Sequence, residues 1–130
     1  MRCQQMLRLI GLPALAVLLL VRCSPDCEWS AVVQTWVDRN ENAVWDAGEP
    51  PLPNVKCFVE SFKAAGTAQA VSNEKGEARL YVLLAGCPRE VAFFIYVLPP
   101  SSYRMVTQTT IPAKETDERV FQFGFVPVGE

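Results

Sequence analysis

The stretch that decides the fold is Thr35–Val59, which reads T-W-V-D-R-N-E-N-A-V-W-D-A-G-E-P-P-L-P-N-V-K-C-F-V. It opens on the end of an apolar, β-branched run that begins at Trp29, a composition typical of a strand. A polar loop, Asp38–Glu49, follows. Three prolines then make a stiff connector that cannot join a sheet interior, and Val55 starts a second strand-like run. The pattern predicts two strands joined by a structured polar loop.

The rest of the chain continues as short strand-like runs between turn residues, with no sustained helical period. The segment Asn73–Gly76 predicts a tight hairpin turn in which Gly76 supplies a positive φ. Glu90–Leu98 is the most apolar run and a candidate for the centre of a sheet. We therefore expect an all-β fold, a seven-stranded sandwich of two sheets. The expected strands are residues 29–37, 55–62, 67–72, 77–84, 90–98, 103–110 and 118–126, with a polar crossing at 111–117.

Residues 1–23 resemble an export leader. Two arginines precede an apolar run, Leu9–Val21, whose 13 residues are fewer than the roughly 20 that a membrane span needs. The run fits the apolar part of a secretory signal. It ends in L-V-R-C, which resembles a bacterial lipoprotein signal in which Cys23 is acylated. Because Arg22 stands where that signal has a small residue, a freely secreted protein is the alternative.

This leader predicts where the protein works. Residues 24–130 are long enough for one domain with a single core. We expect that domain to be exported and anchored to the cell membrane, on its extracellular or periplasmic face, through the N-terminal lipid or the leader itself.

Composition excludes several classes of function. The chain has 12 Lys and Arg against 14 Asp and Glu, and without the leader's three arginines the balance is 9 against 14, a net charge of −5. This balance disfavours a nucleic-acid partner, which needs a basic face. The chain has no histidine, so Ser-His-Asp and Cys-His catalysis and His-ligated transition metals are excluded. Oxygen and thiolate chemistry remain.

The cysteines predict a disulfide. Export to an oxidising compartment favours disulfide bonds, and Cys57 and Cys87 each stand at the edge of an apolar run. We expect these two to pair, which leaves Cys27 over. If Cys23 is not acylated, a Cys23–Cys27 pairing is an alternative that the spacing does not decide.

The loop Asp38–Glu49 carries the clearest chemistry. Oxygen-bearing side chains fall at loop positions 1, 3, 5, 9 and 12, the spacing of a twelve-residue calcium loop, in which position 7 contributes its backbone carbonyl. Three carboxylates and two amides suit calcium better than magnesium, which keeps its waters. The expected calcium ligands are Asp38, Asn40, Asn42, Val44, Asp46 and Glu49.

Ala43 departs from this pattern, because position 6 normally holds a glycine. A β-carbon there costs about 1 kcal/mol if φ must be positive. Weak binding would still suit an extracellular calcium site. The alternative is a polar loop held by Asx-turns alone. A strand-like run before the loop and Pro50-Pro51 after it exclude an EF-hand helix pair, so we expect a structural clasp and not a sensor.

The order of these features resembles the calcium-binding B-repeat of serine–aspartate-repeat surface adhesins, the SdrD B-like domains. The similarity begins with Thr35–Val59 and continues through Ser72–Glu77, Leu84–Gly86 and Leu98–Tyr103. It implies an Ig-like or prealbumin-like β-sandwich, shared with collagen-adhesin B-type modules, and a stalk or spacer role in surface proteins. Some relatives form a Lys–Asn or Lys–Asp isopeptide. We expect none here, because the last strand has no Asn or Asp.

These features predict a non-enzymatic surface module with a structural or adhesion-type role, whose partner is another surface protein or a matrix component. The alternative is a solute- or carbohydrate-binding accessory lipoprotein, which needs an exposed aromatic patch. The candidates for that patch are Trp29, Trp36 and Trp45. An enzyme would have to use carboxylates of the polar loop as acid and base, and a solvated loop is a poor place to raise a carboxylate pKa.

Overall fold

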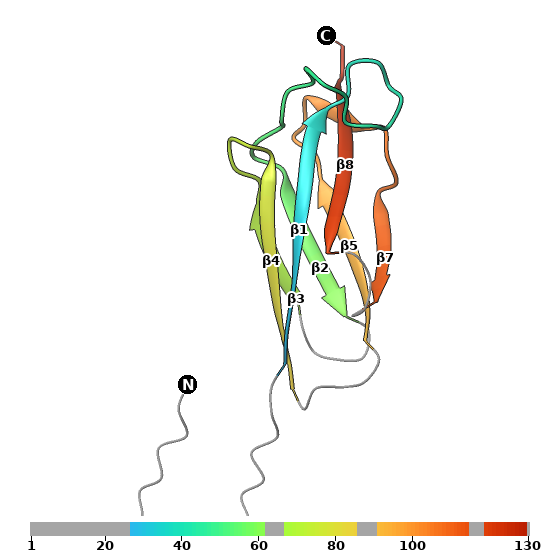
Figure 1. Cartoon of the computed structure of the whole chain (residues 1–130). Helices are drawn as coiled ribbons and strands as arrows, with labels where there is room; N and C mark the ends of the chain where they lie inside the picture. The colour runs from blue at the N-terminus through green and yellow to red at the C-terminus, as the bar shows by residue number, and fades with distance from the viewer. Residues whose placement is uncertain (1–26, 62–66, 86–90, 115–118, 130) are drawn as a thin grey trace, which may run out of the picture.

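Two four-stranded sheets form a β-sandwich in the computed structural model (Figure 1). The structure describes residues 27–61, 67–85, 91–114 and 119–129, and these residues contain no helix. None of the described segments is therefore a helix that could cross a membrane. The strands are β1 Cys27–Val37, β2 Lys56–Ser61, β3 Thr67–Val71, β4 Glu77–Leu84, β5 Ala92–Leu98, β6 Tyr103–Met105, β7 Thr110–Lys114 and β8 Val120–Pro127.

The first strand organises its sheet. In the first sheet the strand order is β4-β1-β8-β6, and in the second it is β3-β2-β5-β7. Strand β1 pairs antiparallel with β4, from Cys27–Leu84 to Gln34–Glu77, and parallel with β8, from Val32–Val120 to Val37–Phe125. The other strand pairs are antiparallel. The expected central place of the 90–98 run is confirmed, because β5 lies between β2 and β7.

The described residues form eight strands, and the expected seven is wrong. The expected strand 103–110 contains β6 and only the first residue of β7, and these two short strands lie at the edges of different sheets. Most of the expected polar crossing at 111–117 is β7 itself. The sequence signal is weak there because Ala113 is the one residue of this edge strand that is fully buried. Pro112 adds a turn signal, although an edge strand tolerates proline.

Alternation of buried and exposed residues builds the core. Strand β4 buries every second residue, including Leu80 and Val82. Strand β1 does the same over its first half and buries Trp29 against Phe93 of β5, with ring centroids 4.1 Å apart and planes at 17°. This stacked pair joins the two sheets, because its members belong to different sheets.

The turn Asn73–Gly76 has the predicted conformation and a different role. Gly76 has φ 71°, as expected, and the side-chain oxygen of Asn73 accepts N–H bonds from Lys75 and Glu77 at 2.9 and 3.0 Å. The turn is no hairpin, however, because β3 pairs with β2 whereas β4 pairs with β1. It carries the chain from one sheet to the other. A β-carbon on Gly76 would clash with the carbonyl oxygen of Thr35.

Replacing Gly76 should therefore be far more damaging than replacing a glycine that only has a positive φ. We expect Gly76→Ala to lower the free energy of unfolding by about 3 kcal/mol, because backbone strain and a clash with a backbone atom add. Gly48 has φ 92°, and a β-carbon on it would meet nothing within 4 Å, so Gly48→Ala should cost only about 1 kcal/mol. Urea unfolding of both variants measures this difference, and equal losses would contradict it.

The expected Cys57–Cys87 disulfide is wrong, because Cys57 is not disulfide-bonded. Its thiol is free and fully buried, and it lies 3.6 Å from the carbonyl oxygen of Val55. Cys57 is the second residue of β2 and lies on its core face, opposite Ala70 and Val97. Cys27, expected to be left over, is disulfide-bonded. The leader, Cys23 and Cys87 lie outside the described residues.

Burial predicts an inert thiol at position 57. Loss of water around the thiolate raises the pKa of Cys57 to about 12. At pH 8.5, alkylation of this thiol should be at least about 100-fold slower in the folded than in the unfolded protein, because the thiolate is the reactive form. Mass spectrometry of the Cys57 peptide, with and without denaturant, gives both rates, and fast labelling of folded protein would contradict the buried position.

The stability that the Cys57 thiol contributes is complete below the unfolded pKa of about 8.5 and is lost as pH rises towards about 12.

Candidate cation-binding loop

The loop Asp38–Glu49 leaves β1 and returns to it. The N–H of Val37 donates to the carbonyl of Pro50 at 2.9 Å, and Trp36 forms an isolated bridge with Pro51. The N–H of Asp38 donates to the carbonyl of Phe125 in β8 at 2.8 Å. The start of the loop is thus hydrogen-bonded to β8, and the segment that follows its end is hydrogen-bonded back to β1. It lies at the end of the sandwich opposite the start of β1 (Figure 1).

Asp38 anchors the loop from inside. Its side chain is fully buried, and its two carboxylate oxygens accept the N–H groups of Asn42 at 3.3 Å and Ala43 at 2.7 Å. A buried carboxylate must be paired or hydrogen-bonded to be tolerated. These bonds meet that need and curl the backbone around the carboxylate.

Asn40 and Asn42 surround Asp46. Each amide oxygen accepts the N–H of the residue two positions later, at 3.2 Å for Asn40 and 2.8 Å for Asn42. Each amide nitrogen donates to the same oxygen of Asp46, at 2.8 and 2.7 Å. These donors, first that of Asn40 and then that of Asn42, lower the pKa of Asp46 because they favour its charged form.

Glu49 closes the loop. One of its carboxylate oxygens accepts the N–H of Arg39 at 2.8 Å, and the other accepts the N–H of Asp46 at 3.0 Å. The indole N–H of Trp45 donates to the Glu49 carbonyl at 3.1 Å, and the Trp45 ring stacks on buried Trp36 with centroids 5.6 Å apart. The last residue of the loop thereby joins its start to its second half.

The predicted ligands fit calcium in kind, but their oxygens are engaged with N–H groups. Five of the six have side-chain oxygens within one loop. The sixth, Val44, would contribute its backbone carbonyl, and its side chain is exposed. In the described part of the chain, no three carboxylates or thiolates gather as a metal site would require. To bind calcium beside Asp46, Asn40 and Asn42 would have to turn their amides so that the oxygen, and not the N–H, faces the ion. The contacts present are those of the Asx-turn alternative.

The backbone of the loop has the strain that its sequence predicts. Ala43, at position 6, has φ 62°, in the left-handed region that favours glycine. Glu41 also has a positive φ, 57°, which the sequence did not signal. The Glu41 carboxylate accepts a bond from Arg104 of β6 at 2.8 Å, with both side chains half-exposed. Such an exposed ion pair contributes at most about 1 kcal/mol.

Relieving this strain should stabilise the protein. Ala43 is exposed, so Ala43→Gly loses no packing, and we expect it to raise the free energy of unfolding by about 1 kcal/mol. Ala47 is exposed in the same loop with a negative φ, so Ala47→Gly should be neutral or destabilising through the entropy of the unfolded chain. Thermal unfolding without added metal compares the two, and equal effects would contradict the argument.

The tryptophans proposed as a ligand patch do not form one. Trp29 and Trp36 are 1% and 0% exposed, and their indole N–H groups have no hydrogen-bond partner among the described residues. A partly exposed aromatic pair is instead Phe58 with Tyr96 on the outer face of the second sheet, with ring centroids 5.0 Å apart and planes at 9°. Sequence reasoning missed this pair, although its members alternate with the buried residues of their strands. The Tyr96 hydroxyl donates to Glu60 at 2.7 Å, which raises the pKa of Tyr96.

Comparison with known proteins adds little. No family model matches the chain. It is similar to Colossin-A from Dictyostelium discoideum, with 27% identity over 74 residues, which is 57% of this chain and 1% of that protein. The chain therefore spans a very small part of the curated relative that it matches, and the similarity assigns it no activity.

Proposed function

We propose that this chain is a non-enzymatic, exported surface module of the SdrD B-like type, an Ig-like or prealbumin-like sandwich tethered to the membrane by its N-terminal leader. In this proposal its role is structural or adhesive, and calcium in the loop Asp38–Glu49 stabilises it. The observation that carries the proposal is the attachment of the loop: Asp38, the first ligand, is fully buried where β1 ends, next to β8.

This attachment explains how an ion at the loop would stabilise the whole domain. Both ends of the loop are hydrogen-bonded to β1 or to its neighbour β8. Three ligand carboxylates brought together around one site would repel one another, and a divalent cation would offset that repulsion. Fixing the loop would therefore fix the end of the first sheet.

The strand directions support a spacer role. Strands β1 and β8 are adjacent and parallel, so the start of β1 and the end of β8 lie at opposite ends of the sandwich (Figure 1). A module that is entered at one end and left at the other transmits a pull along its long axis. It can also join further modules end to end. The carbohydrate-binding alternative loses its main support, because two of the three tryptophans that it needs are buried.

Calcium should raise the melting temperature of the full-length chain. With a dissociation constant of about 10⁻⁴–10⁻³ M, 5 mM calcium stabilises the folded state by about 1–2 kcal/mol relative to excess chelator. That corresponds to a rise of about 5–15 °C for a domain of this size. Calorimetry in chelator, calcium and magnesium measures the rise, which should be smaller with magnesium.

The matched variants are Glu49→Gln and Glu41→Gln. Both remove one carboxylate from the same loop, but Glu41 is not a predicted ligand and pairs with Arg104. Glu49→Gln should abolish most of the calcium-dependent rise, whereas Glu41→Gln should keep it. The calcium clasp is falsified if the melting temperature of the unmodified chain does not change with calcium, or if both variants lose the rise equally.

A further inference from the structure

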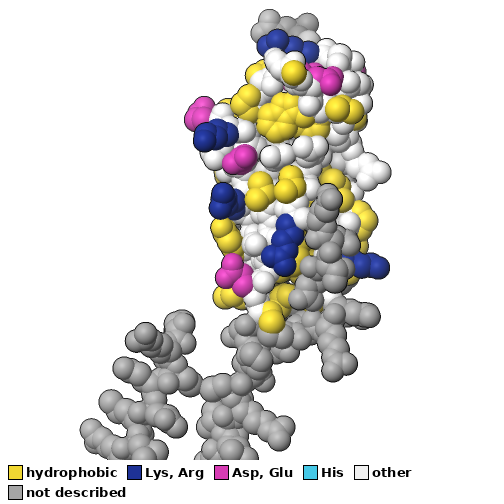
Figure 2. All heavy atoms as spheres, viewed as in Figure 1, with side chains coloured by type: hydrophobic (Ala, Val, Ile, Leu, Met, Phe, Trp, Pro, Cys, Tyr) yellow, Lys and Arg dark blue, Asp and Glu magenta, His cyan; other side chains and the backbone are white. Residues whose placement is uncertain are grey.

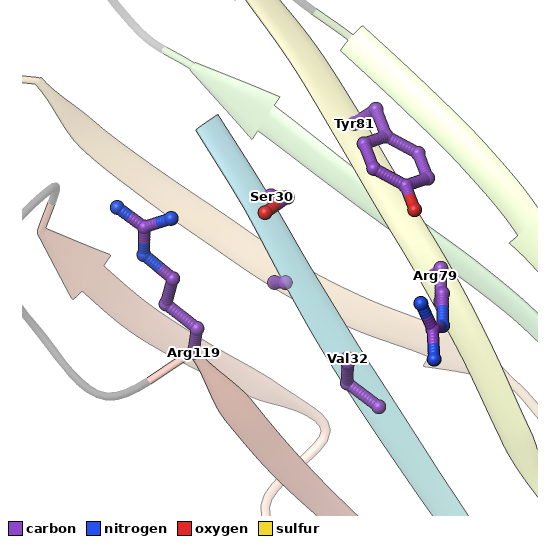
Figure 3. Close-up of a pocket in the computed structure, with 6 residues that line it drawn as sticks. Ser30, Val32, Arg79, Tyr81 and Arg119 are labelled. Atoms are coloured by element: carbon purple, nitrogen blue, oxygen red, sulfur yellow. The ribbon is translucent and has the colours of Figure 1, made fainter. Parts of the chain in front are cut away.

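A shallow, basic pocket lies on the outer face of the first sheet, away from the loop (Figure 3). Its volume is about 100 Å³, enough for a single small polar group. The lining residues come from β1, from β4 and from the position just before β8, and they are Ser30, Ala31, Val32, Arg79, Tyr81 and Arg119.

The strand register places the two arginines on either side of β1. Arg79 of β4 is directly opposite Val32. On the other side, the N–H of Val32 donates to the carbonyl oxygen of Arg119 at 2.7 Å. The backbones of the two arginines are thus two strand spacings apart, about 10 Å. Figure 3 shows their side chains flanking the stretch of β1 that carries Ser30 and Val32.

The two guanidinium groups have no carboxylate partner among the described residues. The ion pair that the structure shows joins Arg104 and Glu41, near the loop. Basic side chains and an acidic one, at the lower left, lie among apolar side chains over the lower part of this face (Figure 2). In a chain with a formal net charge of −2, two neighbouring unpaired arginines make a local positive field against the overall charge.

Two hydroxyl groups complete the set of donors. Ser30 of β1 lies directly opposite Tyr81 of β4, and both line the pocket. A hydroxyl can donate one hydrogen bond to an anion, and an arginine can donate several in a rigid fork. The lining of this one small pocket therefore contains donor groups from β1, from β4 and from the residue just before β8.

We propose that this pocket binds a tetrahedral oxyanion, the sulfate or phosphate group of a larger ligand. A planar carboxylate presents its oxygens in one plane and pairs best with one arginine fork. A tetrahedral group has oxygens in several directions and can accept bonds from arginines on opposite sides at once. The small volume takes the charged group and leaves its carrier outside the pocket.

The test is a titration of the isotopically labelled full-length chain, in neutral detergent, with sodium sulfate and sodium phosphate at constant ionic strength. We expect saturable shifts of the Arg79 and Arg119 side-chain N–H signals. Arg79→Gln and Arg119→Gln each remove the signals of one arginine, and the affinity measured at the other should fall at least about fivefold. Arg104→Gln is the matched control, because it removes a surface arginine that already has a partner, and it should leave the affinity unchanged.

Three results would overturn the site. They are shifts that do not saturate, shifts that chloride reproduces at the same ionic strength, and equal loss in the Arg104→Gln control. Acetate tests the shape of the ligand: binding as tight as that of sulfate would contradict a tetrahedral group. None of these results depends on calcium, so this proposal and the calcium clasp fail separately.

The carrier of the oxyanion is tested in lipid nanodiscs. If a lipid headgroup supplies the phosphate, the Arg79 and Arg119 signals should already be shifted in discs containing phosphatidic acid, without added anion. If a soluble ligand supplies the group, those signals should remain unshifted in these discs and respond only to added sulfate or phosphate. A lack of response in either medium contradicts the proposal.

Discussion

The structure depends on β1 being hydrogen-bonded along both of its edges, and on Thr35 in particular. Thr35 is fully buried. Its N–H donates to the carbonyl of Gly76 at 2.8 Å, its carbonyl accepts the N–H of Leu52 at 2.9 Å, and its hydroxyl lies 2.6 Å from the Leu52 carbonyl. One residue thereby holds the connector after the loop and the turn between the sheets. Buried backbone groups that lack a strand partner must find another, and here they converge on Thr35.

The described contacts differ in kind between the two ends of the sandwich. The buried polar residues of the described chain are Thr35, Asp38 and Ser72. The Ser72 hydroxyl donates to the Leu52 carbonyl at 2.9 Å and accepts the N–H of Val55 at 3.0 Å. At this end the chain leaves regular pairing, so side chains replace the missing strand bonds. Towards the other end, Trp29 and Phe93 stack between the sheets, and Cys27 at the start of β1 is disulfide-bonded.

This division explains why the proposed calcium site and the oxyanion pocket can be independent. The loop belongs to the polar end, where Asp38 links it to the backbone of β8. The pocket lies towards the start of β1, on a face made by regular strand pairing. A change in the loop would alter the stability of the domain, whereas a change of Arg79 or Arg119 removes exposed charge from an intact sheet. Surface substitutions of that kind usually change stability little.

Local features of the molecule were readable from the sequence. Alternation predicted the strands of the core, and turn chemistry predicted the positive φ of Gly76, because both signals depend only on neighbouring residues. The calcium-loop pattern marked Ala43 as the position where a positive φ would cost energy. Tertiary structure alone decided that the turn at Gly76 changes sheets, that Cys57 is a free core thiol, that Trp29 and Trp36 are core, and that Arg79 and Arg119 lie on either side of β1. Each of these depends on which strands pair over long sequence separations, and residue periodicity carries no information about partners.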